Sequence, residues 1–296
     1  MSSEPPKSRP AARPPNPQGK PRFGKPRFAG KGGAGKGRAD RGERTPREVP
    51  DDGRVELYGI HAVAAALANP DRQFRSLVAT ENAARRLGDA ITARGLTVEN
   101  VSPRDLDRRL GADTVHQGVL AVAEPLPEPD LADLVRAAGS TGGPLLVLDQ
   151  VTDPHNAGAI LRSAAVFGAS GVVMTRRHSP PLNGTLAKSA SGALELVPVA
   201  LVQNLARAMA ELKESGVTLI GLDGEGDALL DDQPLAGAVA FVLGAEGKGL
   251  RQLTRETCDK VCRIGTSGAL ASLNVSNAAA ISLHLAFMRR RQAASA

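Results

Sequence analysis

Two segments in the second half of the chain place polar side chains among glycines and other small residues. Asn156 and Arg162 lie six residues apart, and Glu246 lies in the glycine-rich run 244–249. An amide, a guanidinium and a carboxylate can bind and polarise a hydroxyl or a phosphate. Glycines allow the main chain to approach a flat or bulky ligand. These residues therefore indicate a binding site in which a polar group is oriented.

A third segment, 268–281, reads as a loop of small residues that leads into a helix. Asn274 is a suitable N-cap, because its side-chain oxygen can accept an unpaired N–H of the first helical turn. Ser272 and Asn274 would then lie beside free N–H groups at the positive end of the helix dipole. That position suits an anionic or polar ligand.

Three familiar ligand loops do not fit the glycines and carboxylates. The run 244–249 lacks the G-x-G-x-x-G spacing of dinucleotide enzymes, which disfavours an oxidoreductase. Residues 30–36 nearly spell a phosphate loop, but Gly37 stands where Ser or Thr should bind magnesium. Asp223 could open a calcium loop, but Ala228 replaces the required turn glycine.

Histidines and cysteines give no metal or catalytic cluster in the sequence. Cys258 and Cys262 are the only cysteines, so we expect packing residues in a reducing compartment and no metal site. His61 and His116 are isolated, and an isolated histidine is more often structural than catalytic.

The polar segments fall between strands and helices that alternate from residue 144 onward. This alternation predicts an α/β domain with a mainly parallel sheet and helices on both faces. Ligands of such sheets bind beyond the carboxyl ends of the strands, where loops 152–158, 244–249 and 265–274 should lie, with Asn156 in the first loop. We expect strands at 145–149, 171–174, 196–200, 217–222, 239–243 and 260–264, and helices near 186–190, 205–214 and 275–286. A further helix should follow the first loop, with Leu161, Ala164, Ala165 and Gly168 on one face.

A smaller α/β unit is predicted before this domain. Expected strands at 74–79, 97–101 and 119–123 alternate with helices near 58–67, 83–94 and 103–110. The predicted organisation is a disordered basic arm (1–52), a small α/β unit (53–124), a linker (125–143) and the larger domain (144–291).

The basic charge of the chain is concentrated in the predicted arm. The whole chain has a net charge of +6. Residues 1–54 carry +8, and the rest of the chain carries −2. An arm rich in Pro, Gly, Lys and Arg cannot bury enough surface to fold, but it can contact nucleic-acid phosphates. A solubilising tail without a fixed partner is the alternative. No apolar run is long enough to span a membrane, and no secretory signal is visible, so we expect a cytoplasmic protein.

Taken in order, the motifs Asn156-x-Gly158-x-x-x-Arg162, 243–249 and 272–276 resemble those of the SpoU (TrmH) group of SPOUT RNA ribose 2′-O-methyltransferases. The resemblance covers about residues 145–290. Residues 55–123 also resemble the small RNA-binding domain that precedes this domain in bacterial 23S rRNA guanosine 2′-O-methyltransferases. One departure is that Gly265 and Thr266 follow Ile264, where the family usually has Pro-Met.

The resemblance implies a trefoil-knotted parallel-sheet domain, a homodimer and the cofactor S-adenosylmethionine. Methyl transfer to a ribose 2′-hydroxyl would need in-line geometry and removal of a proton. Because a guanidinium rarely accepts a proton, Arg162 is expected to clamp the target phosphate and polarise the 2′-oxygen. The resemblance further implies catalytic or positioning roles for Asn156, Glu246, Ser272 and Asn274, and cofactor contacts for Leu243, Gly244, Gly249, Ile264 and Leu273.

The expected activity is methylation of a guanosine ribose in 23S ribosomal RNA. A tRNA guanosine is the alternative substrate within the same class. A non-catalytic RNA-binding or ribosome assembly factor is the alternative from another class, although Arg162, Glu246 and Asn274 favour an enzyme.

Overall fold

A computed structural model of the protein describes residues 53–268 and 273–295, which belong to one compact unit. The predicted basic arm, residues 1–52, lies outside the described residues, and so does Ser272. No helix of the described part is long and apolar enough to cross a membrane.

Residues 55–123 form a four-stranded sheet in the order β1-β4-β2-β3, which contains the three predicted strands and an additional one, β1. β2 and β3 are parallel, whereas β4 is antiparallel to both β1 and β2. The strands are β1 (Val55–Tyr58), β2 (Phe74–Ala79), β3 (Val98–Asn100) and β4 (Val119–Ala123). The helices are α1 (Ile60–Ala68), α2 (Glu81–Arg86), α3 (Gly88–Ala93) and α4 (Pro103–Leu110).

The single helix predicted over 83–94 is two short helices in the structure. α2 ends at Arg86, its C-cap Leu87 has a φ of −103° and a ψ of 3° outside the helical values, and α3 begins at Gly88. Glycine weakens a helix interior because it has the most backbone freedom to lose, so a break at this point is physically reasonable.

Residues 145–263 form a seven-stranded sheet in which all the strand pairs of the described chain are parallel. The strand order is β7-β6-β5-β10-β8-β11-β9. Its strands are β5 (Leu145–Leu148), β6 (Gly171–Thr175), β7 (Val199–Val202), β8 (Thr218–Leu222), β9 (Ala228–Leu229), β10 (Val239–Leu243) and β11 (Lys260–Arg263). Its helices are α5 (Leu131–Thr141), α6 (Pro154–Phe167), α7 (Gly184–Ser189), α8 (Leu205–Glu214), α9 (Gln252–Thr257) and α10 (Val275–Ser295), with 3-10 turns η1 (Ala193–Glu195) and η2 (Leu230–Asp232).

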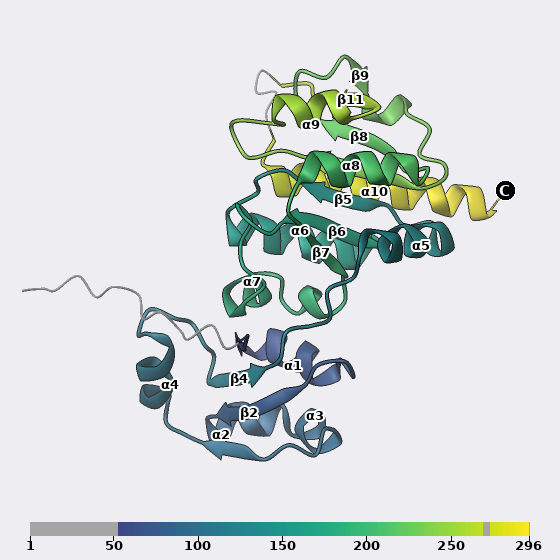
Figure 1. The fold of residues 1–296 in the computed structure, drawn as a ribbon. Coiled ribbons are helices and arrows are strands. Elements are labelled where there is room, and N and C mark those ends of the chain that lie inside the picture. The colour runs from purple at the N-terminus through teal and green to yellow at the C-terminus, as the bar shows by residue number, and fades with distance from the viewer. Residues whose placement is uncertain (1–52, 269–272, 296) are drawn as a thin grey trace, which may run out of the picture. The chain divides into compact units, whose positions relative to one another are not determined.

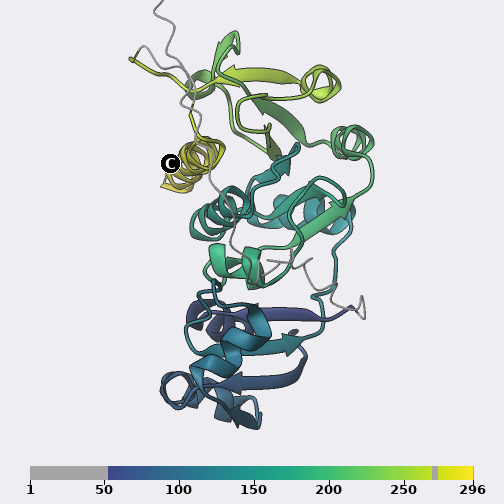
Figure 2. The same ribbon diagram turned by 90° about the vertical axis from the view of Figure 1, so that its left-hand side faces the viewer.

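Helices cover both faces of this sheet, as predicted (Figure 1). Successive residues of a strand point to opposite faces, and β5 divides its side chains accordingly. Leu146 and Leu148 join the core that contains α6 and α10, whereas Leu145 and Val147 join the core that contains α5 and α8. In Figure 2 the yellow α10 lies on one side of the strands and the green α8 on the other.

The strand order changes direction between β5 and β10. From β5 the chain moves outward through β6 and β7, and then returns to build β8 and β10 on the other side of β5. A crevice at the carboxyl ends of strands is the usual ligand site at such a point. The predicted polar loops after β5, β10 and β11 all begin at this edge of the sheet.

Some predicted boundaries are wrong. The strand expected at 196–200 is β7, which starts at Val199, because η1 occupies 193–195 and Leu196 is 72% exposed. The short elements α9 and β9 had not been predicted at all. The trefoil knot stays a prediction, because residues 269–272 of the final loop lie outside the described part.

Candidate active site

Asn156 lies in the first turn of α6 and not in the preceding loop, so the predicted position was wrong by a few residues. Asp153 caps this helix, since its Oδ1 accepts a hydrogen bond from the His155 N–H at 2.9 Å. Pro154 follows at the first helical position, where its missing N–H costs nothing. The helix therefore starts earlier than the polar residue that it presents to the site.

Gly158, one half-turn further along α6, permits close packing of α6 against α7. A Cβ atom at this position would lie 2.4 Å from Ser189 Cβ and 2.8 Å from the Ala190 nitrogen. No real side chain tolerates such distances. The glycine of the first motif is thus required for packing, which holds the start of α6 in place.

The glycine-rich loop after β10 folds back on itself. The Gly249 N–H donates to the Ala245 carbonyl at 2.9 Å, and a Cβ on Gly244 would lie 2.1 Å from the carbonyl carbon of Gly249. Gly247 has a φ of +77°, a conformation that side chains disfavour. This tight loop positions the side chain of Glu246 at its tip.

The buried Asp149 fixes the far end of the glycine-rich loop. Its side chain is 0% exposed and accepts two hydrogen bonds from Arg251, one from the main-chain N–H at 3.1 Å and one from Nε at 2.7 Å. Charge-assisted hydrogen bonds of this kind are among the stronger ones in proteins. Asp149 was not predicted as a site residue, although it directly follows the buried strand β5.

The structure brings Asn156, Glu246 and Asn274 into one hydrogen-bonded cluster. Asn156 Nδ2 donates to Glu246 Oε2 at 3.0 Å, and Asn274 Nδ2 donates to Asn156 Oδ1 at 3.0 Å and to Glu246 Oε2 at 3.3 Å. The three residues follow β5, β10 and β11. We refer to them below as the polar cluster.

Asn274 also caps α10, as predicted. Its Oδ1 accepts the Ser276 N–H at 2.8 Å and the Ser276 hydroxyl at 2.6 Å. One side chain thus begins the last helix with its oxygen and joins the polar cluster with its nitrogen.

Arg162 lies apart from the polar cluster on α6. Six residues at about 100° each place it roughly 120° around the helix from Asn156. Its side chain is exposed and makes no hydrogen bond or ion pair with any residue in the described part of the chain. A guanidinium in this setting remains available for a phosphate or a carboxylate from outside.

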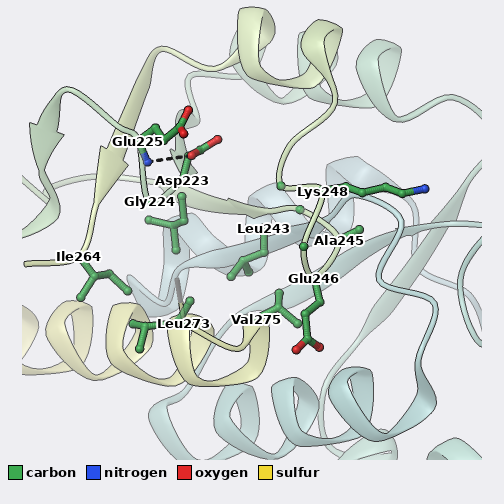
Figure 3. Close-up of a pocket in the computed structure, with 15 residues that line it drawn as sticks. Asp223, Gly224, Glu225, Leu243, Ala245, Glu246, Lys248, Ile264, Leu273 and Val275 are labelled. Carbon is green, nitrogen blue, oxygen red and sulfur yellow. Dashed lines mark hydrogen bonds between the residues drawn. The ribbon is translucent and has the colours of Figure 1, made fainter. Parts of the chain in front are cut away.

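A cavity of about 430 Å³ opens beside the polar cluster. Its size is within the usual range for small-molecule sites. Figure 3 shows Glu246 at one end of the lining, with Asp223 and Glu225 at the other. All five residues predicted to contact a cofactor line this cavity: Leu243, Gly244, Gly249, Ile264 and Leu273.

The loop after β8 contributes lining residues that sequence reasoning missed. Asp223 and Glu225 line the cavity, and the Glu225 N–H donates to Asp223 Oδ1 at 2.9 Å. Arg255 Nη1 donates to Asp223 Oδ2 at 2.5 Å. The available signal was position, since this loop follows a predicted strand of the parallel sheet.

The two histidines considered from the sequence lie in the small unit. His116 is 8% exposed, its Nδ1 accepts the Gly118 N–H at 3.0 Å, and its Nε2 lies 3.1 Å from Asp107 Oδ1. Both ring nitrogens of His116 thus have local hydrogen-bond partners, which fits the structural role expected for this residue. Of the cysteines, Cys258 is unreactive, because burial raises the pKa of its thiol to about 12.

Comparison with known proteins identifies the family of this chain. Residues 143–284 match the model of the SpoU rRNA methylase family, and residues 57–129 match the RNA 2′-O ribose methyltransferase substrate-binding model. The 23S rRNA (guanosine-2′-O-)-methyltransferase RlmB of Escherichia coli K12 is 39% identical over 241 residues, which cover 79% of this chain and 98% of that protein. The protein of the same name from Vibrio parahaemolyticus is 41% identical over 242 residues, covering 79% and 96%.

A solved structure is similar over most of the described chain. The SpoU methyltransferase AviRb from Streptomyces viridochromogenes, crystallised in complex with AdoMet, matches with a TM-score of 0.67 and 26% identity. The match covers 80% of this chain and 91% of AviRb. On the site geometry, the two family models and these relatives together, this chain belongs to the SpoU rRNA methylase family.

Proposed function

We propose that this protein transfers a methyl group from S-adenosylmethionine to the 2′-hydroxyl of a guanosine ribose in 23S ribosomal RNA. The observation that carries the proposal is the polar cluster at the edge of a cavity formed by three strand-end loops. The relatives named 23S rRNA (guanosine-2′-O-)-methyltransferase support this substrate, since they are about 40% identical over nearly their whole length. A ribosomal RNA substrate also implies a cytoplasmic location.

The residues of the cavity suit S-adenosylmethionine, which supplies an electrophilic methyl group on its sulfonium when bound. Leu243, Ile264 and Leu273 offer apolar surface for a flat ring, and the glycine-rich loop brings main-chain atoms to the lining. Asp223 and Glu225 add carboxylates that can accept hydrogen bonds from hydroxyl or ammonium groups.

The polar cluster would orient the ribose beside the cavity. Asn274 Nδ2 donates one hydrogen bond to Asn156 Oδ1, and Asn156 Nδ2 donates to Glu246, so the second N–H of Asn156 Nδ2 is held in a fixed direction and would be the donor to the ribose. Glu246 accepts from both amides and would hold this arrangement during methyl transfer. Ser272, two residues before Asn274, is proposed to hold in place the loop before α10, which would bind the cofactor.

Arg162 is proposed to bind the phosphate of the target nucleotide and to polarise its 2′-oxygen. A guanidinium stays protonated at neutral pH, so that phosphate is the proposed proton acceptor rather than Arg162 itself. The exposed position of Arg162 on α6 supports contact with a large substrate.

A homodimer is part of the proposal. α6 and α10 pack against each other and expose apolar side chains on their outer surfaces, with Val166 at 73%, Ile281 at 42% and Met288 at 36%. A second copy covering this surface would bury them and would lie close to the catalytic helix α6. The trefoil knot is proposed with it, on the resemblance to the SPOUT group.

The purified full chain should methylate 23S rRNA with radiolabelled S-adenosylmethionine, and the modified position should map to a guanosine 2′-oxygen. Transfer to tRNA alone would favour the alternative substrate. No transfer to either RNA, despite cofactor binding measured by calorimetry, would favour the non-catalytic assembly factor.

Replacing Arg162 with Ala should abolish methyl transfer and leave cofactor affinity within about twofold, because Arg162 does not line the cavity. Single-turnover assays and calorimetry on the same preparation separate the two effects. Retained activity in this variant would remove Arg162 from the proposed mechanism.

A further inference from the structure

One exposed face of α6 carries two groups able to bear positive charge. His155 and Arg162 are seven residues apart, so they lie within about 20° of each other around the helix and about 10 Å apart along it. Both side chains are exposed. Asn156 of the polar cluster directly follows His155, so this face starts beside the proposed reaction centre.

The start of this face touches α7. His155 Nδ1 lies 3.4 Å from the Ser189 hydroxyl, and the missing side chain of Gly158 lets the two helices approach closely. The residue before Ser189 is Lys188, in the last turn of α7. Lys188 therefore lies one residue from the contact between α7 and the start of this face.

Lys188 stands where α7 meets the small four-stranded unit. Its Cγ lies 3.5 Å from the point that a Cβ of Gly59 would occupy, and Gln117 Oε1 lies 3.3 Å from the same point. The Tyr58 hydroxyl is hydrogen-bonded to the Thr185 hydroxyl at 2.8 Å, which ties β1 to the start of α7. The lysine stem is thereby packed between the small unit and the catalytic domain.

The ammonium group of Lys188 is unpaired within the described part of the chain. It forms no hydrogen bond or ion pair with any residue among 53–268 and 273–295. Glu195, the last residue of the 3-10 turn η1 that follows α7, does not neutralise this charge, because its carboxylate is paired with Arg72 at 2.7 Å. A positive charge held by its stem and left uncompensated is suited to an anion that arrives with a partner.

We propose that Lys188 binds a backbone phosphate of the RNA next to the target nucleotide, and that the RNA backbone continues from there past His155, beside the polar cluster, to Arg162. This inference rests on the proposed RNA methyltransferase function. The match of residues 57–129 to a substrate-binding model favours RNA as the partner, because Lys188 lies against this unit. Lys188 is thus a positioning residue, because it neither lines the cavity nor joins the polar cluster.

The test compares Lys188→Gln with Lys188→Arg and with a matched control, Lys213→Gln. Lys213 also lies in the last turn of a helix, α8, but is paired with Asp259 at 2.9 Å. α8 ends where the chain enters β8, at the opposite edge of the sheet from the polar cluster. For each protein, RNA binding is measured at several salt concentrations, together with KM for RNA, kcat and S-adenosylmethionine affinity.

Lys188→Gln should raise the dissociation constant and KM for RNA about five- to tenfold and lower the slope of log affinity against log salt by about 0.7 to 1. Cofactor affinity should not change, and single-turnover rates at saturating RNA should stay within about threefold, because the residue acts through RNA placement. Lys188→Arg should retain RNA affinity, and Lys213→Gln should match the wild type.

Equal salt slopes for Lys188→Gln and the wild type would overturn the inference, as would an Arg variant as weak as the Gln variant. Failure of the proposed function looks different, because the wild-type protein itself would then not methylate RNA. Loss of RNA affinity in Lys213→Gln to the same degree would show a general charge effect and would also reject the specific role of Lys188.

Discussion

At the level of single residues, the polar cluster depends on which atoms donate and which accept. Asn156 donates to Glu246 through its nitrogen and accepts from Asn274 through its oxygen, so both of its polar atoms are used. An aspartate has the same shape but has no donor when ionised. The cluster therefore requires an amide at position 156, because the side chain must donate and accept a hydrogen bond at the same time.

Replacing Asn156 with Asp should lower kcat about a hundredfold at pH 8, since it disrupts the cluster that is proposed to orient the ribose. Two carboxylates about 3 Å apart cannot both stay ionised, so the pair should take up a proton with a raised apparent pKa. An O–H···O hydrogen bond then replaces the lost one. The activity of the variant relative to the wild type should therefore recover as pH falls.

The pH dependence of kcat from pH 6 to 9 tests this, with Asn100→Asp on the exposed surface of β3 as control. The control should track the wild type across the range. A ratio of variant to wild-type activity that does not change with pH would contradict the proposed repulsion between positions 156 and 246.

At the level of elements, α6 is held by its contact with α7 as much as by its own sequence. The cap at Asp153 sets where α6 begins, and Gly158 sets how near α7 can lie. Both features were visible as residue types in the sequence. Their structural role could not be predicted, because the sequence does not show that position 158 faces Ser189.

Gly158→Ala should destabilise the fold by about 1–3 kcal/mol, because the added methyl group forces α6 and α7 apart. Gly139→Ala in α5 is the matched control, since nothing lies within 4 Å of its added Cβ. That change should instead stabilise the protein by about 0.5–1 kcal/mol through helix propensity. Urea unfolding of both variants measures the difference, and equal effects would show that the α6–α7 contact is not tight.

At the level of the whole described molecule, a buried ion pair joins the small unit to the catalytic domain. The side chains of Arg72 and Glu195 are each 2% exposed and form two hydrogen bonds, at 2.7 and 3.1 Å. Asn69 Nδ2 donates to the same carboxylate at 2.9 Å, and Arg72 Nη1 donates to the Glu124 carbonyl at 2.7 Å. The pair thereby fixes the α1–β2 connection against η1.

Arg72→Met should lower the free energy of unfolding by about 3–5 kcal/mol, because it leaves the Glu195 carboxylate buried without its charge partner. The double variant Arg72→Met with Glu195→Leu should recover much of this loss, since no unpaired charge then remains buried. Arg85→Met is the control, because its pair with Glu81 is largely exposed and contributes little. Denaturant unfolding of all three variants gives the values. A single variant no weaker than the control would show that the buried pair is not important for stability.

The sequence by itself determined the alternation of strands and helices, the cap at Asn274 and the edge of the sheet where ligand loops gather. These features depend on neighbouring residues, because side-chain periodicity and capping act within a turn or two. The five residues predicted to contact the cofactor were selected through the resemblance of their motifs to the SpoU group, and they line one cavity because loops after parallel strands share one edge of the sheet.

Only the tertiary structure decided which side chains meet. Asn156 lies 90 residues from Glu246 and 118 from Asn274, and their contact depends on β10 inserting between β5 and β8. The strand order depends on how the helices pack against the two faces of the sheet. This packing is a property of the assembled core and not of any single segment. The same packing brought the β8 loop into the cavity, turned Arg162 outward and set Lys188 against the small unit.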